Sequence, residues 1–372
     1  MTTSPATLHT LPIKGLDWES LVPLVGRANR AVAKYSGIIS ALANPHLLLS
    51  PLTTQEAVLS SRIEGTQATL GDVLKFEAGE VPKQEGRESD IHEILNYRRA
   101  LREAERELAK KPFGLNLLRR LHGILLDSVR GRDKGRGEFR RIQNWIGPHG
   151  SPIEQAYFIP PGPERVMQYM DNWEKYYHMD RPDPLVQLAI LHAQFESIHP
   201  FLDGNGRIGR LIIPLFLFEK NVLPSPMFYL SAWLDSHRRE YYDRLRAIQQ
   251  TTHGWNEWIR FFLLGIESQA ENNMKTSQGI IELYGRLKDE IIRLTRSQWS
   301  VPLLDAMFNQ PVFSGSQLRF KKPTPTRAAV TNLLRGLSRS RVLKVVTPGS
   351  GRRGTVFVLA ELVNLCEGKR VF

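Results

Sequence analysis

The stretch HPFLDGNGRIGR, residues 199–210, joins two apolar runs of this 372-residue chain. The run before it, 185–198, predicts a helix that the proline of the stretch ends, and the run after it, 211–218, continues a second helix. The first N–H groups of a helix have no intrahelical partner and carry partial positive charge, so a helix start of this kind binds anions. Gly204 and Gly206 let the backbone approach a ligand closely. The stretch therefore predicts a phosphate site at a helix N-terminus.

The side chains of this stretch are those that phosphoryl chemistry requires. His199 can act as a general base near neutral pH, and Asp203 offers a hard carboxylate to Mg²⁺. Arg207 and Arg210 are permanent cations for the outer phosphates. Each residue alone is better explained as a cap, a turn or a solvated helix face. All four within one short stretch favour a functional site.

A second signal lies upstream, in SSRIEG at residues 60–65. Ser60 and Glu64 are four residues apart and therefore share one face of a predicted helix. Glu64 lies at the C-terminal end of that helix, where the dipole disfavours an anion, so its carboxylate needs a cation from elsewhere in the fold. A glutamate before a glycine is also common on protein surfaces, and the residues alone leave both interpretations open.

Composition limits the class of protein. A hydrophobic content of 41% over 372 residues predicts a globular chain of two or three domains. The single cysteine, Cys366, excludes an internal disulfide and fits a reducing compartment. No apolar run has membrane-spanning length, and the N-terminus lacks the pattern of a secretory signal. We therefore expect a soluble cytoplasmic protein without a membrane partner.

Helical periodicity covers most of the chain. Helices are predicted at 20–42, at 53–65, twice within 87–129, at 163–179, at 183–198 and in segments between 255 and 294. The stretch 130–163 is rich in Gly and Pro and predicts loops, with a short hairpin at 153–159. Its residues Tyr157, Phe158 and Ile159 either belong to a strand edge that aligns an extended target segment or pack together in a surface loop.

Three more residues have two interpretations each. Tyr241 and Tyr242 follow the second helix, where their rings can stack on an adenine, although packing in the core explains them nearly as well. His192 shares a helix face with His199, but no set of residues with metal-ligand spacing surrounds it. We therefore predict that His192 is a core histidine.

The basic excess is concentrated at the C-terminal end. Residues 301–372 contain 12 basic and 3 acidic side chains, which is +9 of the formal net charge of +12. A basic terminal domain is typical of a nucleic-acid binder, although an excess of one charge also serves solubility.

The predicted elements of this region are helices at 301–308, 314–320 and 326–337, followed by a hairpin at 342–359. Their order resembles a winged helix. Its third helix and its turn would offer to DNA the residues Arg327, Thr331, Arg335, Arg352 and Arg353. Winged-helix domains also dock proteins, so DNA binding is one of two interpretations.

The stretch 199–210 resembles the motif of the Fic family, HxFx(D/E)GNGRxxR, and matches it at every specified position. Proteins of this family transfer AMP from ATP to a hydroxyl of a target protein. The resemblance implies that His199 is the base that takes the proton from a Ser, Thr or Tyr hydroxyl, and that Asp203 is the Mg²⁺ ligand. The implied nucleotide-binding residues are Gly204, Asn205, Gly206, Arg207, Ile208, Gly209 and Arg210, with Tyr241 or Tyr242 at the adenine. A kinase-like branch carries Lys in place of Gly206, so the glycine favours AMP transfer over phosphate transfer.

The segment 60–65 similarly resembles the inhibitory motif of the family, (S/T)xxxE(G/N). The resemblance implies that Glu64, one turn after Ser60, pairs with Arg210. That pair would keep the γ-phosphate of ATP out of its productive position.

The resemblance also implies an architecture that is mostly helical, in three units. Residues 1–85 would form an N-terminal helical region with the inhibitory helix, 86–295 a Fic helical-bundle core with a small β-hairpin flap, and 296–372 a winged helix-turn-helix domain. The implied activity is that of a nucleotidyltransferase, a protein adenylyltransferase that uses ATP with Mg²⁺ and modifies target proteins, itself included. Further partners would be DNA, through 296–372, and a second copy of the chain in a homodimer.

The alternative function is a DNA-binding regulator whose Fic core is a catalytically silent nucleotide sensor. An intact His199 beside Asp203 favours the enzyme, because a sensor has no need of a base next to the phosphates.

Overall fold

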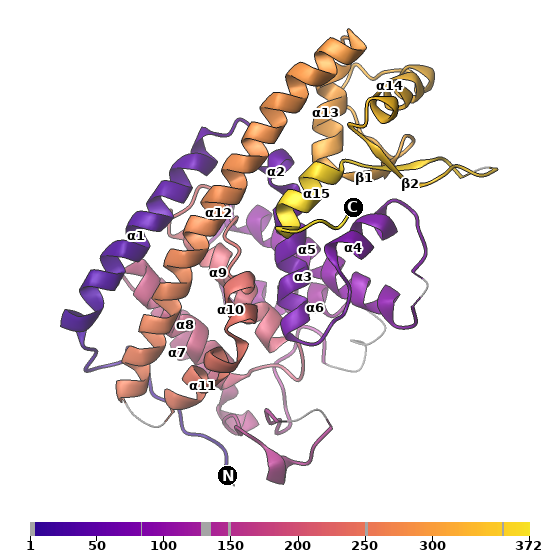
Figure 1. Cartoon of the computed structure of the whole chain (residues 1–372). Helices are drawn as coiled ribbons and strands as arrows, with labels where there is room; N and C mark the ends of the chain where they lie inside the picture. The colour runs from indigo at the N-terminus through magenta and orange to yellow at the C-terminus, as the bar shows by residue number, and fades with distance from the viewer. Residues whose placement is uncertain (1–3, 83, 128–134, 148–149, 250–251, 352) are drawn as a thin grey trace.

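Helices make up most of the chain, and one small sheet lies near its C-terminal end (Figure 1). The computed structural model describes residues 4–372 except 83, 128–134, 148–149, 250–251 and 352. None of the helices formed by these residues is both long enough and apolar enough to cross a membrane. The mostly helical architecture predicted from the sequence is confirmed.

Two long helices, α1 (Trp18–Ala41) and α12 (Thr252–Thr295), lie side by side along one flank of the molecule (Figure 1). Asp17 caps α1, because its side chain accepts a hydrogen bond from the Ser20 N–H at 3.2 Å. The helical segments predicted between 255 and 294 prove to be one continuous helix of 44 residues. Helix α12 also contacts α8, α10 and α11 of the helical part and α13, α14 and α15 of the C-terminal segment.

Five helices form the core, and α8 is one of them, packed against α7, α9 and α12. Their bounds are α5 Arg87–Leu108, α6 Leu115–Leu125, α7 Val166–His178, α8 Pro184–Ile198 and α9 Asn205–Glu219. Every residue of α8 from its second position onward is buried, including the polar residues Gln187, His192, Gln194, Glu196 and Ser197. Trp173 of α7 and Trp258 of α12 are fully buried and donate their indole N–H groups to the carbonyls of Leu191 and Ala189, at 2.8 and 2.7 Å. The core thus encloses α8 and fixes where its C-terminal end lies.

A second group of helices carries the upstream signal. Their bounds are α2 Pro45–Leu48, α3 Ser50–Ile63, α4 Leu70–Glu77, α10 Ser231–Ser236 and α11 Arg238–Ala247. Helix α3 contacts α5, α9 and α10. The predicted helix at 53–65 is therefore present, and it packs directly on the helix that follows the glycine-rich stretch.

The C-terminal segment forms a three-stranded antiparallel sheet with helices beside it. The bounds are α13 Ser300–Asn309, β1 Val312–Ser314, α14 Arg327–Arg339, β2 Lys344–Thr347, β3 Val356–Val358 and α15 Ala360–Glu367. The strand order is β1-β3-β2, and the predicted hairpin is confirmed as β2 and β3. The predicted helix at 314–320 is wrong, because Val312 and Phe313 pair with β3 and Gly315 begins a turn. The winged-helix resemblance stays a prediction, and Arg352 lies outside the described residues.

The C-terminal sheet packs against α4, which follows the segment 60–65 in sequence. Strand β1 contacts α4, and the Gln317 side chain donates a hydrogen bond to the Glu77 carbonyl at 2.9 Å. The ammonium of Lys75 lies 5.1 Å from the ring centroid of Phe372. The C-terminal residues are thus in contact with the N-terminal helices, and the division into units 1–85, 86–295 and 296–372 stays a prediction.

Replacing Trp258 with alanine tests how far the enclosed core depends on its largest side chains. Trp258 is fully buried, so Trp258→Ala is expected to lower the free energy of unfolding by about 3–5 kcal/mol, through lost burial and a cavity. Urea unfolding followed by circular dichroism measures this change. Val22→Ala is the matched control, because Val22 is 57% exposed and its loss is expected to change stability by less than about 0.5 kcal/mol. Equal effects of the two substitutions would contradict this account of the core.

Candidate active site

The site begins where α8 ends. Asp183 caps the start of α8 by accepting hydrogen bonds from Leu185 N–H and Val186 N–H, both at 2.9 Å. His199 ends the helix in a left-handed conformation, with φ 49° and ψ 59°. A residue before proline avoids the right-handed helical region, and a left-handed backbone is uncommon for residues other than glycine. The fold therefore holds His199 out of line with the buried helix that delivers it.

The loop from Pro200 to Gly204 is closed by the side chain of Asn205. Its carbonyl oxygen accepts from the Phe201 N–H and its amide donates to the Phe201 carbonyl, both at 2.8 Å. Gly204 adopts φ 77°, a conformation that glycine takes at no steric cost, and precedes the first residue of α9. The predicted glycine-rich helix start is thus formed, with the side chain of Asn205 occupied by the loop itself.

His199 is poised as a neutral imidazole. Its Nδ1 lies 3.2 Å from the carbonyl oxygen of Glu196, which can only accept, so Nδ1 carries the proton of this hydrogen bond. Burial lowers the pKa of His199 to about 4. The second ring nitrogen, Nε2, is therefore unprotonated at neutral pH and available to accept a proton.

Arg207 and Asp203 form a connected pair at the loop. Arg207 is 4% exposed and donates to Glu93 of α5 at 2.7 Å and to Asp203 Oδ1 at 3.3 Å. The Gly204 N–H also donates to that oxygen, at 2.5 Å. The Asp203 side chain remains 42% exposed, and its Oδ2 has no hydrogen-bond partner among the described residues.

One carboxylate oxygen of this kind fits Mg²⁺ when the ion arrives with a nucleotide. Mg²⁺ is usually held by one or two carboxylates together with substrate phosphates and water. The described part of the chain contains no group of three or more His, Cys, Asp or Glu side chains that could hold a metal. Asp203 is therefore suited to a nucleotide-borne cation and not to an ion bound by protein ligands alone.

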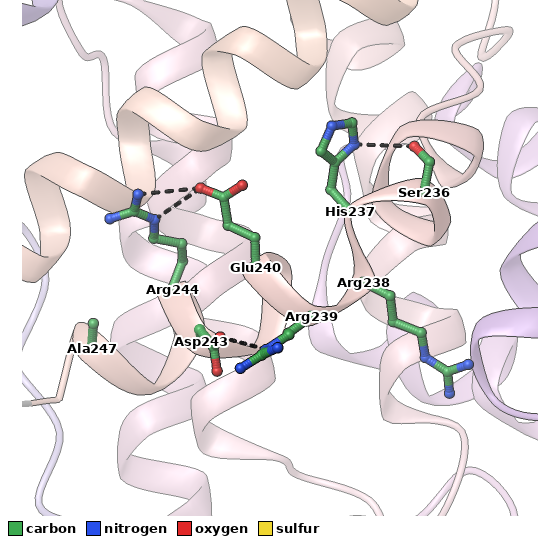
Figure 2. A pocket seen from close by; sticks show the side chains of 8 residues that line it. All are labelled: Ser236, His237, Arg238, Arg239, Glu240, Asp243, Arg244 and Ala247. Atoms are coloured by element: carbon green, nitrogen blue, oxygen red, sulfur yellow. Dashed lines mark hydrogen bonds and ion pairs between the residues drawn. The ribbon is translucent and has the colours of Figure 1, made fainter.

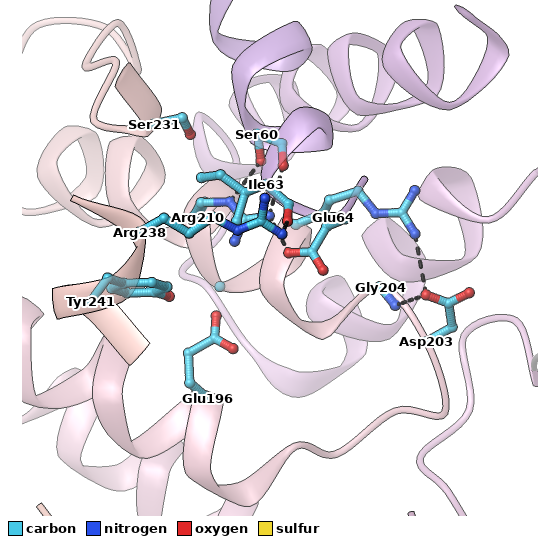
Figure 3. Close-up of polar contacts among 12 residues, drawn as sticks. Ser60, Ile63, Glu64, Glu196, Asp203, Gly204, Arg210, Ser231, Arg238 and Tyr241 are labelled. Atoms are coloured by element: carbon cyan, nitrogen blue, oxygen red, sulfur yellow. Dashed lines mark hydrogen bonds and ion pairs between the residues drawn. The ribbon is translucent and has the colours of Figure 1, made fainter. Parts of the chain in front are cut away.

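Arg210 is buried and is held by the residues that the upstream signal predicted (Figure 3). Its Nε donates to Ser60 Oγ at 2.9 Å, and its Nη2 donates to the Ser60 carbonyl at 2.8 Å and to Glu64 Oε1 at 2.5 Å. Burial alone would raise the pKa of Glu64, but the Arg210 guanidinium outweighs it and holds that pKa below its ordinary value. Glu64 is thus ionised at neutral pH and in contact with the arginine of the motif.

Helix α3 is fastened to α10 and the start of α11 by three polar contacts. The buried carboxyl of Glu56 accepts from the N–H and the hydroxyl of Ser231, at 3.1 and 2.6 Å. Arg62 pairs with Asp235 at 2.5 Å. Arg238 donates to the carbonyl of Ile63, the last residue of α3. These contacts fix the helix end that presents Glu64 to Arg210.

A cavity of about 910 Å³ brings His199, Asp203, Arg210 and Glu64 together. Its lining includes Ile63, Glu64, Trp145, Ile146, Gly147, Tyr157, Phe158, Glu196, Ser197, His199, Asp203, Gly206, Arg210, Arg238, Arg239, Tyr241, Tyr242, Asp243, Leu245 and Arg246. A volume of this size accommodates a nucleotide. A second hollow adjoins the cavity and shares Arg238, Arg239 and Asp243 with it (Figure 2). Its other lining residues are Ser236, His237, Glu240, Arg244 and Ala247.

The predicted flap differs from the expected hairpin. Residues Ile153–Gln155 form a 3-10 turn, and a single bridge joins Phe158 to Ile146. Prolines on both sides of the segment remove the N–H donors that a longer ladder would need. Tyr157 and Phe158 line the cavity, but the side chain of Ile159 is 3% exposed and does not belong to the lining. The predicted hairpin within 153–159 is therefore wrong, because Phe158 pairs with Ile146, outside that segment. Two of the three predicted residues, Tyr157 and Phe158, lie at the site.

Both predicted tyrosines line the cavity, but Tyr241 is buried and Tyr242 is partly exposed. Tyr241 is 1% exposed, and its hydroxyl donates to Nε2 of His192 at 2.9 Å. Nδ1 of the same histidine donates to the Gly209 carbonyl at 3.1 Å, and burial lowers the pKa of His192 to about 3. The prediction of His192 as a core histidine is confirmed. Tyr242 is partly exposed, so it is the freer of the two rings.

Four residues at the site were not predicted. Glu93 and Arg238 come from distant helices, and no local pattern links them to the motif. Glu196 lies one turn before His199, its Oε1 has no hydrogen-bond partner among the described residues, and burial raises its pKa to about 8. His122 was detectable as a histidine on the apolar face of α6, among leucines at helical spacing.

These features define a class: a helical protein in which a glycine-rich helix start, a neutral histidine and the buried Arg210 line one nucleotide-sized cavity, with the buried Arg207 on the same helix. Two family models match the chain. The Fic/DOC family N-terminal model matches residues 22–106, and the Fic/DOC family model matches residues 112–217. The chain therefore belongs to the Fic/DOC family, and the resemblance stated from its motif is confirmed.

Relatives agree with this assignment. The chain is 33% identical over 171 residues to a protein adenylyltransferase Fic of Drosophila erecta, covering 44% of this chain and 31% of that protein. The corresponding protein of Culex quinquefasciatus is 30% identical over 175 residues, with 45% and 31% covered. The chain thus spans about a third of the length of these relatives.

Solved structures share the fold. A Fic family protein of Desulfovibrio desulfuricans aligns with a TM-score of 0.58 at 18% identity, covering 95% of this chain and 98% of its own. Fic-1 of C. elegans aligns with a TM-score of 0.54 at 20% identity, covering 72% and 75%.

The protonation state of His199 can be measured directly. We expect its imidazole to stay neutral, with the proton on Nδ1, down to about pH 5, because burial lowers its pKa to about 4. Nitrogen-15 NMR of histidine-labelled protein between pH 4 and 7 reports both the tautomer and the charge. Comparison with His199→Ala identifies its signal among the 10 histidines. A midpoint near the ordinary histidine value of about 6.5 would contradict this description of the base.

Proposed function

We propose that this protein is a protein adenylyltransferase, which transfers AMP from ATP to a Ser, Thr or Tyr hydroxyl of a target protein. The observation that carries the proposal is the neutral His199 at the rim of a glycine-rich helix start whose two arginines are buried. The relatives named for this activity support it, over the part of the chain that they match.

In the proposed reaction, His199 Nε2 accepts the proton of the target hydroxyl. The freed oxygen attacks the α-phosphorus of ATP and forms a new P–O bond, while the bond between the α-phosphorus and the bridging oxygen breaks. Pyrophosphate leaves with that electron pair. The N–H groups at the start of α9 and the Arg207 guanidinium hold the phosphate oxygens as charge develops on them.

Asp203 would hold Mg²⁺ through its free oxygen, and the ion would supply charge neutralisation on the phosphates. The side chains of Ile208 and Asn205 are buried or occupied, so these positions would contribute backbone groups to the nucleotide. Gly206 leaves the space in which the Glu64 carboxylate now lies, since a β-carbon there would collide with it. Tyr242 would face the adenine, with Tyr241 beneath it, and Tyr157 with Phe158 would align the target.

We further propose that Glu64 inhibits the enzyme from within the chain. The guanidinium of Arg210 uses its donors on Ser60 and Glu64, so the γ-phosphate and the Glu64 carboxylate compete for one cation. Because α3 belongs to the same molecule, the carboxylate has a high effective concentration at the site. Inhibition is relieved when α3 moves or when Glu64 is replaced.

Glu64→Gly is expected to raise the rate of AMP transfer by about 10- to 100-fold, since a charge-assisted contact of about 1.4–2.7 kcal/mol would no longer oppose the productive pose. The assay is incorporation of label from α-labelled ATP into proteins of a lysate and into the chain itself. γ-Labelled ATP is run in parallel.

His199→Ala and the double variant Glu64→Gly/His199→Ala are the matched controls, and both should incorporate no label from α-labelled ATP. Label from γ-labelled ATP alone would reject AMP transfer in favour of phosphate transfer. An unchanged rate of AMP transfer in Glu64→Gly would contradict the inhibitory role of Glu64 but not the proposed transfer reaction.

DNA binding through residues 296–372 is the second function that we propose for the chain. Helix α14 buries Val330, Leu334 and Leu337 on one side. The residues at intervals of four on its other side, Arg327, Thr331, Arg335 and Arg339, are all exposed. A basic helix face with this arrangement fits the phosphates and groove edges of a duplex. Arg353, on the turn beyond β2, is also exposed.

If α14 contacts duplex DNA, retention of the whole protein on a duplex should fall steeply as salt rises. Replacing Arg335 with alanine should weaken binding and reduce the slope against salt by about one phosphate contact. Fluorescence anisotropy with a labelled duplex between 50 and 200 mM salt measures both. Arg286→Ala, on α12, is the matched control, because it also removes one arginine but from an ion pair with Glu361. Equal losses of DNA affinity in the two variants would indicate a nonspecific effect of net charge and would contradict binding through α14.

A further inference from the structure

His122 connects the glycine-rich loop to the helix beneath it. The residue lies on α6 and is completely buried. Its Nε2 lies 2.9 Å from the carbonyl oxygen of Asp203, and its Nδ1 lies 2.9 Å from the Gly137 nitrogen. The Gly137 N–H can only donate and the Asp203 carbonyl can only accept, so Nδ1 is bare and Nε2 carries the proton. Both ring nitrogens are therefore used, with one assigned tautomer.

The ring of His122 is also packed face to face on the loop. It stacks on Phe201 with the centroids 3.7 Å apart and the planes 8° from parallel. Phe201 is in turn held by Asn205 through two hydrogen bonds. A β-carbon on Gly204 would meet Leu125, Leu126 and His122 at 3.3–3.7 Å. The floor of the loop is thus α6, and His122 is the polar contact between them.

We propose that His122 is a positioning residue for Asp203: its Nε2–H fixes the Asp203 carbonyl, and through it the direction in which the carboxylate presents its free oxygen to a nucleotide-bound divalent cation. The inference rests on the metal-binding role that the proposed function gives to Asp203.

The physical reason is the small number of anchors on Asp203. Its backbone oxygen is held by His122, and its Oδ1 is held by the Gly204 N–H and by Arg207. The last two belong to the start of α9, although Arg207 is itself held by Glu93 of α5. Among the described residues, His122 is the one side chain from outside this loop and α9 that hydrogen-bonds directly to Asp203, so loss of that bond leaves the carboxylate held only from its own loop and helix. Groups that orient a metal ligand in this way typically change metal affinity by about 10- to 100-fold when removed.

The chain offers a matched pair of substitutions. In His122→Gln the side-chain amide reaches about as far as Nε2 and can still donate to the Asp203 carbonyl. In His122→Asn the shorter amide reaches about as far as Nδ1, so its oxygen can accept from the Gly137 N–H while the Asp203 contact is lost. The two variants remove the same ring stack, and they differ in which hydrogen bond they keep.

Binding of Mn²⁺ in the presence of α,β-methylene-ATP, which cannot transfer AMP, is measured on the whole protein by electron paramagnetic resonance. We expect His122→Asn to weaken Mn²⁺ binding by about 10- to 100-fold and His122→Gln by less than about threefold. Affinity for the same nucleotide in EDTA should stay within about threefold in both. In an Asp203→Ala background, His122→Asn should have no further effect on Mn²⁺.

Equal losses of Mn²⁺ affinity in the two variants would overturn the proposal, as would an additive effect with Asp203→Ala. Loss of folding in His122→Asn, judged by thermal unfolding, would assign the histidine to stability and overturn it too. Absence of Mn²⁺ binding in the unsubstituted protein would reject the role of Asp203 and this inference together. If Mn²⁺ binding is weakened in His122→Asn but not in His122→Gln and the protein transfers no AMP, the positioning role of His122 is supported. The proposed function is then contradicted.

Discussion

A guanidinium that is buried away from water needs acceptors, and in this protein that requirement organises the site. Arg210 is 1% exposed, and its acceptors are Ser60 Oγ, the Ser60 carbonyl and Glu64 Oε1. Leaving such a charge without a partner is strongly destabilising, so something anionic has to remain beside it. Within this chain, Glu64 fills that role. Under the proposed function the same constraint gives the nucleotide a competitor, and a contact that stabilises the fold also regulates the enzyme.

The surrounding helices fix the positions of His199 and Glu64. Helix α8 is enclosed on all sides and ends at His199, whose left-handed backbone allows the following loop to turn back toward α9. Helix α3 is fastened to α10 and α11, and the C-terminal sheet packs on α4 just beyond it. Under the proposed inhibition, a movement of the end of α3 that releases Glu64 would break its contacts with Asp235 and Arg238 as well as with Arg210. The trigger for release is to be sought at these contacts.

The sequence predicts those features of the fold and site that depend on residues close together in the chain. The turn from His199 to Arg210 and the core role of His192 follow from short patterns whose chemistry is determined within a few residues. The capping box of Thr69 and Asp72 marked α4 in the same way but was not recognised. Continuity of α12 was hidden because Gln269, Asn273 and Ser277 are buried polar residues in its middle. The partners of Arg207 and Asp203, namely Glu93 and His122, come from other helices, and the pairing of Glu64 with Arg210 was inferred from the family motif alone.

The central claim is that Arg210 binds either Glu64 or the γ-phosphate of a nucleotide, and never both. Isothermal titration of ATP and ADP, with Mg²⁺, against the unsubstituted protein and Glu64→Gln measures this directly, because only ATP has a γ-phosphate. The account predicts that the substitution raises affinity for ATP by about tenfold or more, equivalent to at least about 1.4 kcal/mol, and changes affinity for ADP by less than about threefold. Equal changes for ATP and ADP, or no change for either, would contradict it.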